Sequence, residues 1–128
     1  MLTVNDHNEL LALNKALMYV RYLSNDMDPA TRGSALLSEL HARVIEEIIA
    51  SARTSGRYGE VTGWEEWRAL AGRKVELPMI VEHLSRDWAR LASPELKRDV
   101  VRNQLRPFNF SEDDVERLVQ ELDRRLTS

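Results

Sequence analysis

The chain contains no cysteine, and this absence excludes two kinds of architecture. Without cysteine there is neither a disulfide framework nor a zinc site built from thiolates. No run of apolar residues approaches the roughly 18 that a membrane-spanning helix requires. The first residues, MLTVNDHNELL, lack a basic segment followed by a long apolar run, so we expect no secretory signal. Together these features predict a cytoplasmic protein without a membrane anchor.

A large excess of charge of either sign is also missing. The chain has 18 Lys and Arg residues against 21 Asp and Glu residues, which gives a formal net charge of −3. This balance provides no overall attraction to nucleic acid or to an anionic membrane surface. With 43% hydrophobic and 30% charged residues, the composition is that of a folded globular domain. A length of 128 residues predicts a single domain, 1–128.

The hydrophobic pattern has the period of an α-helix almost throughout, and no stretch alternates convincingly at period two. It predicts an all-α fold, a single-domain bundle of five to six helices. One helix, at 34–54, is apolar over more than half of its surface when it is wound at about 100° per residue. We therefore expect it at the centre of the bundle, with neighbours on two or three sides. Its apolar residues are Leu36, Leu37, Leu40, Val44, Ile45, Ile48, Ile49 and Ala52.

Capping residues and helix breakers set the limits of the other helices. Asp6, Ser93 and Ser111 each supply a side-chain oxygen suited to a helix N-terminus. We expect the first helix to begin at Asn5 or Asp6 and a turn to follow at 25–32. Further helices are predicted at 62–71, 78–91, 94–105 and from Ser111 onward. Segment 56–63 holds three glycines in eight residues and is predicted to be a loop, with a possible hinge.

The first helix carries two apolar lines on different faces. The line predicted to face the core contains Leu10, Leu13, Ala16, Leu17, Val20 and Leu23. The second line, Leu11, Met18 and Tyr22, lies on the other side of the helix, and one neighbouring helix cannot cover both. Either another helix of the chain or a second subunit must cover it. Trp64, beside the glycine-rich segment, is the tryptophan expected to be partly exposed. The candidate interface residues are therefore Leu11, Met18, Tyr22 and Trp64.

No pattern in the sequence indicates catalysis, a cofactor or a metal. The three histidines lack a second histidine or a carboxylate at a recognised ligand spacing. No nucleophile motif and no phosphate-binding loop is present. His41 falls in the apolar arc of the central helix, so we interpret it as a hydrogen-bonded core residue, with a ligand or general base as the alternative. His7 and His83 are expected at the surface. No catalytic, cofactor-binding or metal-binding residue is assigned.

The favoured function is therefore a non-enzymatic helical protein-interaction or assembly module that self-associates. Its partner is expected to be a second copy or another protein, and nucleic acid is disfavoured. The first alternative is a DNA-binding regulator resembling a helix-turn-helix protein, although the would-be recognition helix at 78–91 has no basic face. The second is an enzyme or ligand-binding bundle with a pocket near His41 and the tryptophans.

Overall fold

The computed structural model describes residues 2–127, and helices dominate this part of the chain. The N-terminal elements are α1 (His7–Met18), the π-helix η1 (Tyr19–Leu23), α2 (Pro29–Arg32), α3 (Ala35–Thr54) and α4 (Tyr58–Trp67). The C-terminal elements are η2 (Leu70–Gly72), α5 (Glu76–Asp87), η3 (Trp88–Arg90), α6 (Pro94–Leu105) and α7 (Glu112–Thr127). The described residues hold no β-strand, so the all-α prediction is confirmed; of the seven α-helices, α2 is a single turn.

Side chains at the helix N-termini explain why several helices begin where they do. The Asp6 carboxylate accepts the Glu9 N–H at 3.1 Å, which fixes the start of α1. The hydroxyls of Ser93 and Ser111 act in the same way at the start of α6 and at the residue before α7. Each cap satisfies a backbone donor that the helix itself cannot pair. The predictions for these three positions are confirmed, and Ser34 caps α3 in the same way.

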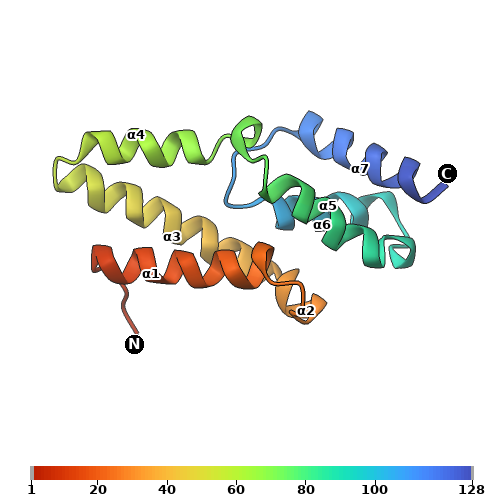
Figure 1. Cartoon of the computed structure of the whole chain (residues 1–128), viewed down its shortest axis with the longest axis horizontal. Coiled ribbons are helices and arrows are strands. Elements are labelled where there is room, and N and C mark those ends of the chain that lie inside the picture. Colours follow the sequence, from red (N-terminus) through yellow and green to blue (C-terminus); the bar gives the residue numbers. More distant parts are fainter. Residues whose placement is uncertain (1, 128) are drawn as a thin grey trace.

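The apolar core consists of two clusters, one in each half of the chain. Figure 1 shows α1, α3 and α4 at one end of the molecule and α5, α6 and α7 at the other. We name the first set the N-terminal cluster: Leu10, Leu17, Val44, Ile45, Ile48, Ile49, Ala52 and Val61. The C-terminal cluster contains Tyr22, Ile80, Leu84, Trp88, Val101, Leu105, Phe108, Val115, Leu118, Val119 and Leu122. Trp67 packs against both clusters and therefore links the two halves.

Helix α3 contacts α1, α4 and α6, which confirms its central position. Ile45 and Ile48 on this helix are fully buried. The predicted burial of Leu36 is wrong, because 78% of that residue is exposed, and Leu40 is exposed as well. At this end of α3 the buried side is the one that carries Ser38 and His41, so polar groups take the place of the expected leucines.

Segment 56–63 differs from the prediction, since α4 begins at Tyr58 rather than at Thr62. Gly56 has a φ of 73° and closes the end of α3, a conformation that favours glycine. Gly59 and Gly63 lie within α4, although glycine costs about 1 kcal/mol in a helix relative to alanine. Burial of Val61 against α3 offsets this cost. A hinge in this segment stays a prediction.

Candidate functional site

The structure places the four predicted interface residues in or beside the core. Tyr22, expected to be covered either by another helix of the chain or by a second subunit, is completely buried within the C-terminal cluster of its own chain. Met18 is half-buried against the same cluster, and Leu11 is half-buried against the N-terminal cluster. Trp64 is also half-buried and packs edge-on to Trp67, with ring centroids 5.2 Å apart. Other helices of the same chain therefore cover the line of Leu11, Met18 and Tyr22.

The π-helix η1 explains the inward position of Tyr22. The Ser24 N–H donates to the Tyr19 carbonyl at 2.9 Å, a bond that spans five residues rather than four. Such a helix turns by less than 100° per residue, so the side chains after Met18 are rotated back relative to an ideal α-helix. Tyr22 consequently reaches the interior beside Arg21, which regular helical spacing already places on the buried side. Regular helical spacing cannot reveal this change of phase.

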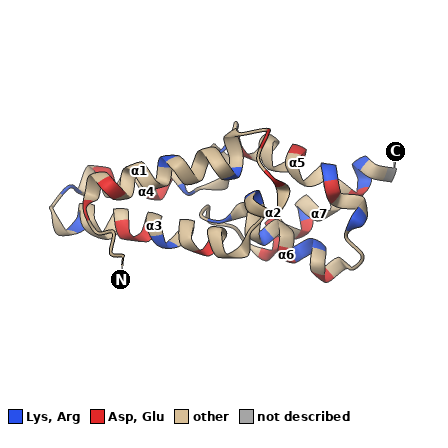
Figure 2. Cartoon of the chain, turned by 90° about the horizontal axis from the view of Figure 1, so that it is seen from below, with Lys and Arg blue, Asp and Glu red and all other residues tan. Residues whose placement is uncertain are grey.

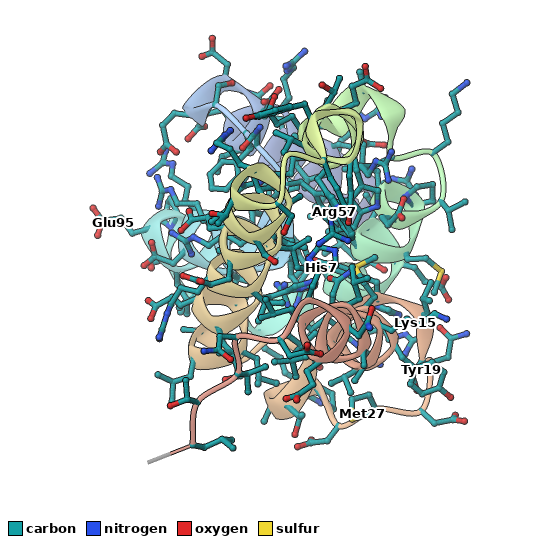
Figure 3. All side chains as sticks on the ribbon, turned by 90° about the vertical axis from the view of Figure 1, so that its left-hand side faces the viewer. His7, Lys15, Tyr19, Met27, Arg57 and Glu95 are labelled. Atoms are coloured by element: carbon teal, nitrogen blue, oxygen red, sulfur yellow. The ribbon has the colours of Figure 1, made fainter. Side chains whose placement is uncertain are left out.

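The exposed face of the first helix is different from the predicted one. Ala12, Ala16, Tyr19 and Leu23 all lie on its solvent side, although Ala16 and Leu23 were expected in the core. Tyr19 is 59% exposed and Leu23 is 48% exposed. Figure 3 shows Lys15 and Tyr19 on the same side of the molecule, pointing away from the bundle. We call this surface, formed by Ala12, Lys15 and Ala16 of α1 and by Tyr19 and Leu23 of η1, the outer face of α1.

A chain of buried polar groups connects α1, α3 and α6 around His41. Arg21 Nη1 donates to His41 Nδ1 at 2.8 Å, and His41 Nε2–H donates to the Asn14 side-chain oxygen at 2.7 Å. Arg21 also donates to the carbonyl of Asn103 at 2.5 Å and to that of Arg106 at 2.6 Å. Carbonyls at the end of α6 carry the negative end of the helix dipole, which favours a buried cation. The interpretation of His41 as a hydrogen-bonded core residue is confirmed.

The alternative of a pocket at His41 is not supported by this geometry. His41 is fully buried and lines neither of the two pockets described below. Burial, and secondly the charge of Arg21, lowers the pKa of His41 to about 3, so the ring is neutral. One signal for this network is present in the sequence: Asn14 and Arg21 continue the buried line of Leu10 and Leu17 at helical spacing.

His7 forms a second polar cluster, which the sequence did not reveal. Its Nδ1 lies 3.0 Å from Ser51 Oγ, and its Nε2 lies 2.6 Å from Glu60 Oε1. The predicted surface position of His7 is wrong, because only 12% of the side chain is exposed; Figure 3 shows it between the helices. The order serine, histidine, carboxylate is that of a nucleophile with its base.

The position of Ser51 argues against nucleophilic catalysis at this cluster. Ser51 lies inside α3, three residues before its last residue Thr54. Backbone N–H groups in a helix interior are used in helical hydrogen bonds, so they cannot stabilise an oxyanion. We therefore interpret the cluster as a structural connection. Hydrogen bonding to His7 lowers the pKa of Glu60, which keeps its carboxylate charged. The cluster joins α1, α3 and α4 through groups far apart in sequence.

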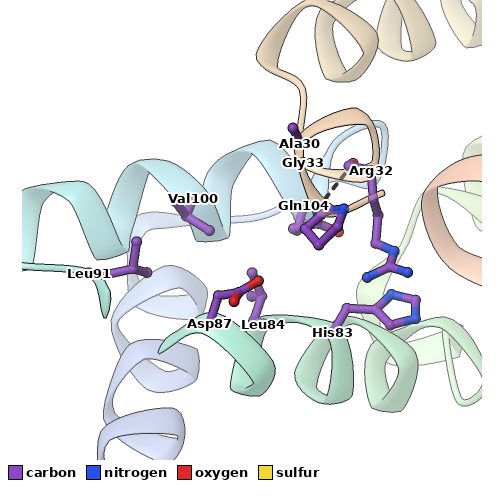
Figure 4. Close-up of a pocket in the computed structure, with 10 residues that line it drawn as sticks. Ala30, Arg32, Gly33, His83, Leu84, Asp87, Leu91, Val100 and Gln104 are labelled. Carbon is purple, nitrogen blue, oxygen red and sulfur yellow. Dashed lines mark hydrogen bonds between the residues drawn. The ribbon is translucent and has the colours of Figure 1, made fainter. Parts of the chain in front are cut away.

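A pocket of about 220 Å³ lies between α2, α5 and α6. Figure 4 shows the Arg32 guanidinium next to the His83 ring at one end of it, with Gln104 to the left of Arg32. Leu84, Leu91, Val100 and Asp87 contribute to the rest of the lining, which is mainly apolar. The predicted surface position of His83 is wrong, since only 5% of this residue is exposed. We refer to this site as the Arg32 pocket.

A wider depression of about 430 Å³ lies between α5 and α7. Leu77, Val81 and Leu118 contribute apolar lining, and Glu82, Glu121 and Arg125 contribute charged groups. Arg86 pairs with Glu82 at 3.2 Å, and Arg125 pairs with Glu121 at 2.9 Å. Because these carboxylates already have ion-pair partners, they are less available to a ligand than the unpaired polar atoms at the Arg32 pocket.

The arginines of α6 are engaged within the protein. Arg98 pairs with Glu116 of α7, while Arg102 pairs with Glu112 of α7 and with Asp99 at 2.9 Å. Figure 2 shows positive and negative residues interspersed along the helices rather than separated onto faces. A DNA-binding face needs cations free to contact phosphates. This arrangement gives no support to the helix-turn-helix alternative.

Two further properties of the described residues concern metals and membranes. Within 2–127, no group of three or more His, Cys, Asp or Glu residues is arranged to hold a metal ion. Over the same residues, none of the helices combines the length and the apolar character needed to cross a bilayer. In comparisons with protein families, with curated protein sequences and with solved structures, the chain matches none.

Proposed function

We propose that the protein is a non-enzymatic helical interaction module that associates with a second copy of itself through the outer face of α1. The observation that carries this proposal is the exposure of Tyr19 and Leu23, two large side chains one turn apart on a helix with few charges. Aromatic and aliphatic anchors of this kind dominate the energy of many protein interfaces. We include a cytoplasmic location in the proposal.

The small side chains in one half of the outer face of α1 can pack against the large side chains in the other half of the same face on a second copy. The first half of this face presents the small side chains Ala12 and Ala16, and its second half presents Tyr19 and Leu23. Antiparallel pairing about a two-fold axis near Leu17 sets Tyr19 opposite Ala16 of the second copy and Leu23 opposite Ala12. One surface patch then serves both subunits. Lys15 lies at the edge, where its stem contacts apolar surface and its ammonium group stays in water.

Sedimentation velocity from micromolar to hundreds of micromolar protein tests this proposal. We expect a concentration-dependent shift from the monomer mass of 14.8 kDa toward a dimer. Tyr19→Glu and Leu23→Glu, each made alone, should weaken the dimer at least about tenfold because each places a charge against an apolar surface. Both residues are exposed, so helix content and the unfolding midpoint should stay near those of the parent.

Tyr58 provides a matched control for this experiment. It is 65% exposed but lies on α4, outside the outer face of α1. Tyr58→Glu should therefore leave the association constant unchanged. A parent chain that sediments as a clean monomer over the whole range contradicts self-association. Equal weakening by all three substitutions contradicts the assignment of the interface to α1.

A further inference from the structure

Three buried side chains at the Arg32 pocket each have a polar atom without a hydrogen-bond partner. These atoms are Arg32 Nε, His83 Nδ1 and Gln104 Oε1. Each of the three residues is at least nine-tenths buried. Buried polar atoms in proteins are almost always paired, because leaving one unpaired costs about 1–3 kcal/mol. All three belong to residues that line the Arg32 pocket, so a molecule bound there can complete their hydrogen bonds.

Arg32 places a cation at one end of the pocket, while Asp87 supplies a carboxylate elsewhere in the lining. Arg32 donates from Nη2 to the carbonyls of Ser24, at 3.3 Å, and Met27, at 3.1 Å. In residues 2–127, no carboxylate lies within ion-pair distance of its guanidinium, while Asp87 at the same pocket pairs with Arg90 at 3.5 Å. A buried guanidinium is normally neutralised by a carboxylate or phosphate. The cation at the end of this pocket therefore has two carbonyl partners but no carboxylate within ion-pair distance.

The other two unpaired atoms are acceptors. His83 Nε2–H donates to the Asn25 side-chain oxygen at 3.4 Å, so Nδ1 retains its lone pair. Burial, and secondly the charge of Arg32, lowers the pKa of His83 to about 4, so the ring is neutral near neutral pH. Gln104 uses Nε2–H for the carbonyl of Arg32 at 3.3 Å, which leaves Oε1 as an acceptor. A complementary ligand must supply a hydrogen-bond donor in addition to an anion.

Size and lining complete the description of the ligand. Leu84, Leu91 and Val100 provide an aliphatic wall. The volume of about 220 Å³ is below the roughly 300–1,000 Å³ of pockets for drug-sized molecules. We propose that the Arg32 pocket binds a small aliphatic acid with a hydrogen-bond donor next to its carboxylate, an α-amino or α-hydroxy acid. Its carboxylate faces Arg32, its donor faces His83 and Gln104, and its chain contacts the aliphatic wall.

Titration of the full chain with four matched compounds, followed by two-dimensional amide NMR, tests this proposal. The compounds are leucine, leucic acid with a hydroxyl in place of the amine, isocaproic acid without the α-donor, and isoamylamine without the carboxylate. We expect saturable chemical-shift changes in α2, α5 and α6 with leucine, leucic acid or both. The compound that binds more tightly shows whether the ligand carries an α-amine or an α-hydroxyl. Isocaproic acid should bind at least about tenfold more weakly, and isoamylamine should produce no saturable shift.

Two variants and a control locate the binding. Arg32→Gln removes the cation and should abolish binding; because Arg32 also holds two carbonyls, Val100→Phe serves as a second variant that fills the pocket from its apolar side. Arg43→Gln, an exposed arginine on α3, should bind like the parent. The proposal is overturned if neither acid binds, which would mean that water alone satisfies the pocket, or if isoamylamine binds as well as leucine. Unchanged binding in Val100→Phe also overturns it.

Discussion

Arg21 and His41, 20 positions apart in sequence, form a hydrogen bond of 2.8 Å between Nη1 and Nδ1 in the interior of the protein. Because an arginine can only donate, the histidine nitrogen that faces it must be an acceptor. The proton of the ring is therefore on Nε2, from which it is donated to Asn14. A second proton on Nδ1 would bring two positive charges into contact without solvent. The pair holds His41 in one neutral tautomer.

This relationship predicts a loss of stability in mild acid. The pKa of His41 is lowered to about 3 and that of His83 to about 4, against 6.5 for the unfolded side chain. Between these values the unfolded chain binds more protons than the folded one, so the free energy of unfolding falls as the pH falls below about 6.5. Each histidine contributes a slope of about 1.4 kcal/mol per pH unit.

Urea unfolding over a series of pH values measures this slope. His83→Gln removes one of the two titrations, so the slope of the variant should be about half that of the parent. Above about pH 7 both histidines are neutral in the folded and the unfolded chain, and the slope from them should vanish. A midpoint that stays constant from neutral pH down to about pH 5 would contradict the neutral, buried state of both rings.

Ile48 and Leu36 provide a matched pair of truncations on α3. Ile48 is fully buried in the N-terminal cluster, so Ile48→Ala should cost about 2–5 kcal/mol. Leu36 is 78% exposed, and Leu36→Ala should change the free energy of unfolding by no more than about 0.5 kcal/mol. Chemical denaturation of both variants measures the difference. Equal midpoints would mean that α3 is peripheral to the core.

Ile48 and Leu36 show which properties of α3 could be predicted from the sequence and which could not. The apolar period correctly predicts α3 and its central position, because a wide apolar surface must be covered by something. It cannot tell which part of that surface is covered, and Leu36 belongs to the part that is not. Caps such as Asp6 and Ser93 are predicted well because they depend on residues within one turn.

Features that depend on distant contacts escaped prediction. The π-helix that rotates Tyr22 inward leaves no trace in the spacing of apolar residues. His7 and Glu60 are 53 positions apart, and only the packing of α4 on α1 and α3 brings them together. The Arg32 pocket combines residues from three helices, and one of these, α2, has only four residues in a segment predicted as a turn. Tertiary structure overrides local propensity at each of these places.

Tyr22 and Tyr19 test the change of helical phase directly. The Tyr22 hydroxyl shares its single proton between two carbonyl acceptors, that of Gln104 at 2.7 Å and that of Arg106. Tyr22→Phe leaves a buried carbonyl with one partner fewer and should cost about 1–3 kcal/mol. Tyr19→Phe, at an exposed position three residues earlier, should be within about 0.5 kcal/mol of the parent. Equal costs measured by thermal and urea unfolding would contradict the rotated arrangement of η1.

Two glycines test whether segment 56–63 is helical. Gly63 lies inside α4, and an added Cβ meets no atom within 4 Å. Gly63→Ala should therefore stabilise the protein by about 0.5–1 kcal/mol through helix propensity and reduced freedom of the unfolded chain. Gly56 also has open space around it, but its φ of 73° is unfavourable for alanine, so Gly56→Ala should destabilise.

The melting temperatures of the two alanine variants should thus move in opposite directions from the parent. A destabilised Gly63→Ala variant would indicate that 59–63 is not helical in solution. Stabilisation by Gly56→Ala would instead mean that the end of α3 does not require a left-handed residue.

The buried hydrogen bonds of Arg21 also decide which arrangement of helices the chain can adopt. Apolar side chains tolerate sliding of one helix along another, because leucine against isoleucine is nearly as favourable one turn further on. A shift of α1 by one turn, about 5.4 Å, would withdraw Arg21 from the Asn103 and Arg106 carbonyls and leave its charge without a partner. Asn14 and His41 would be separated by the same movement. The polar network therefore fixes the register of α1 against α3 and α6. The apolar clusters alone would allow several alignments of these helices.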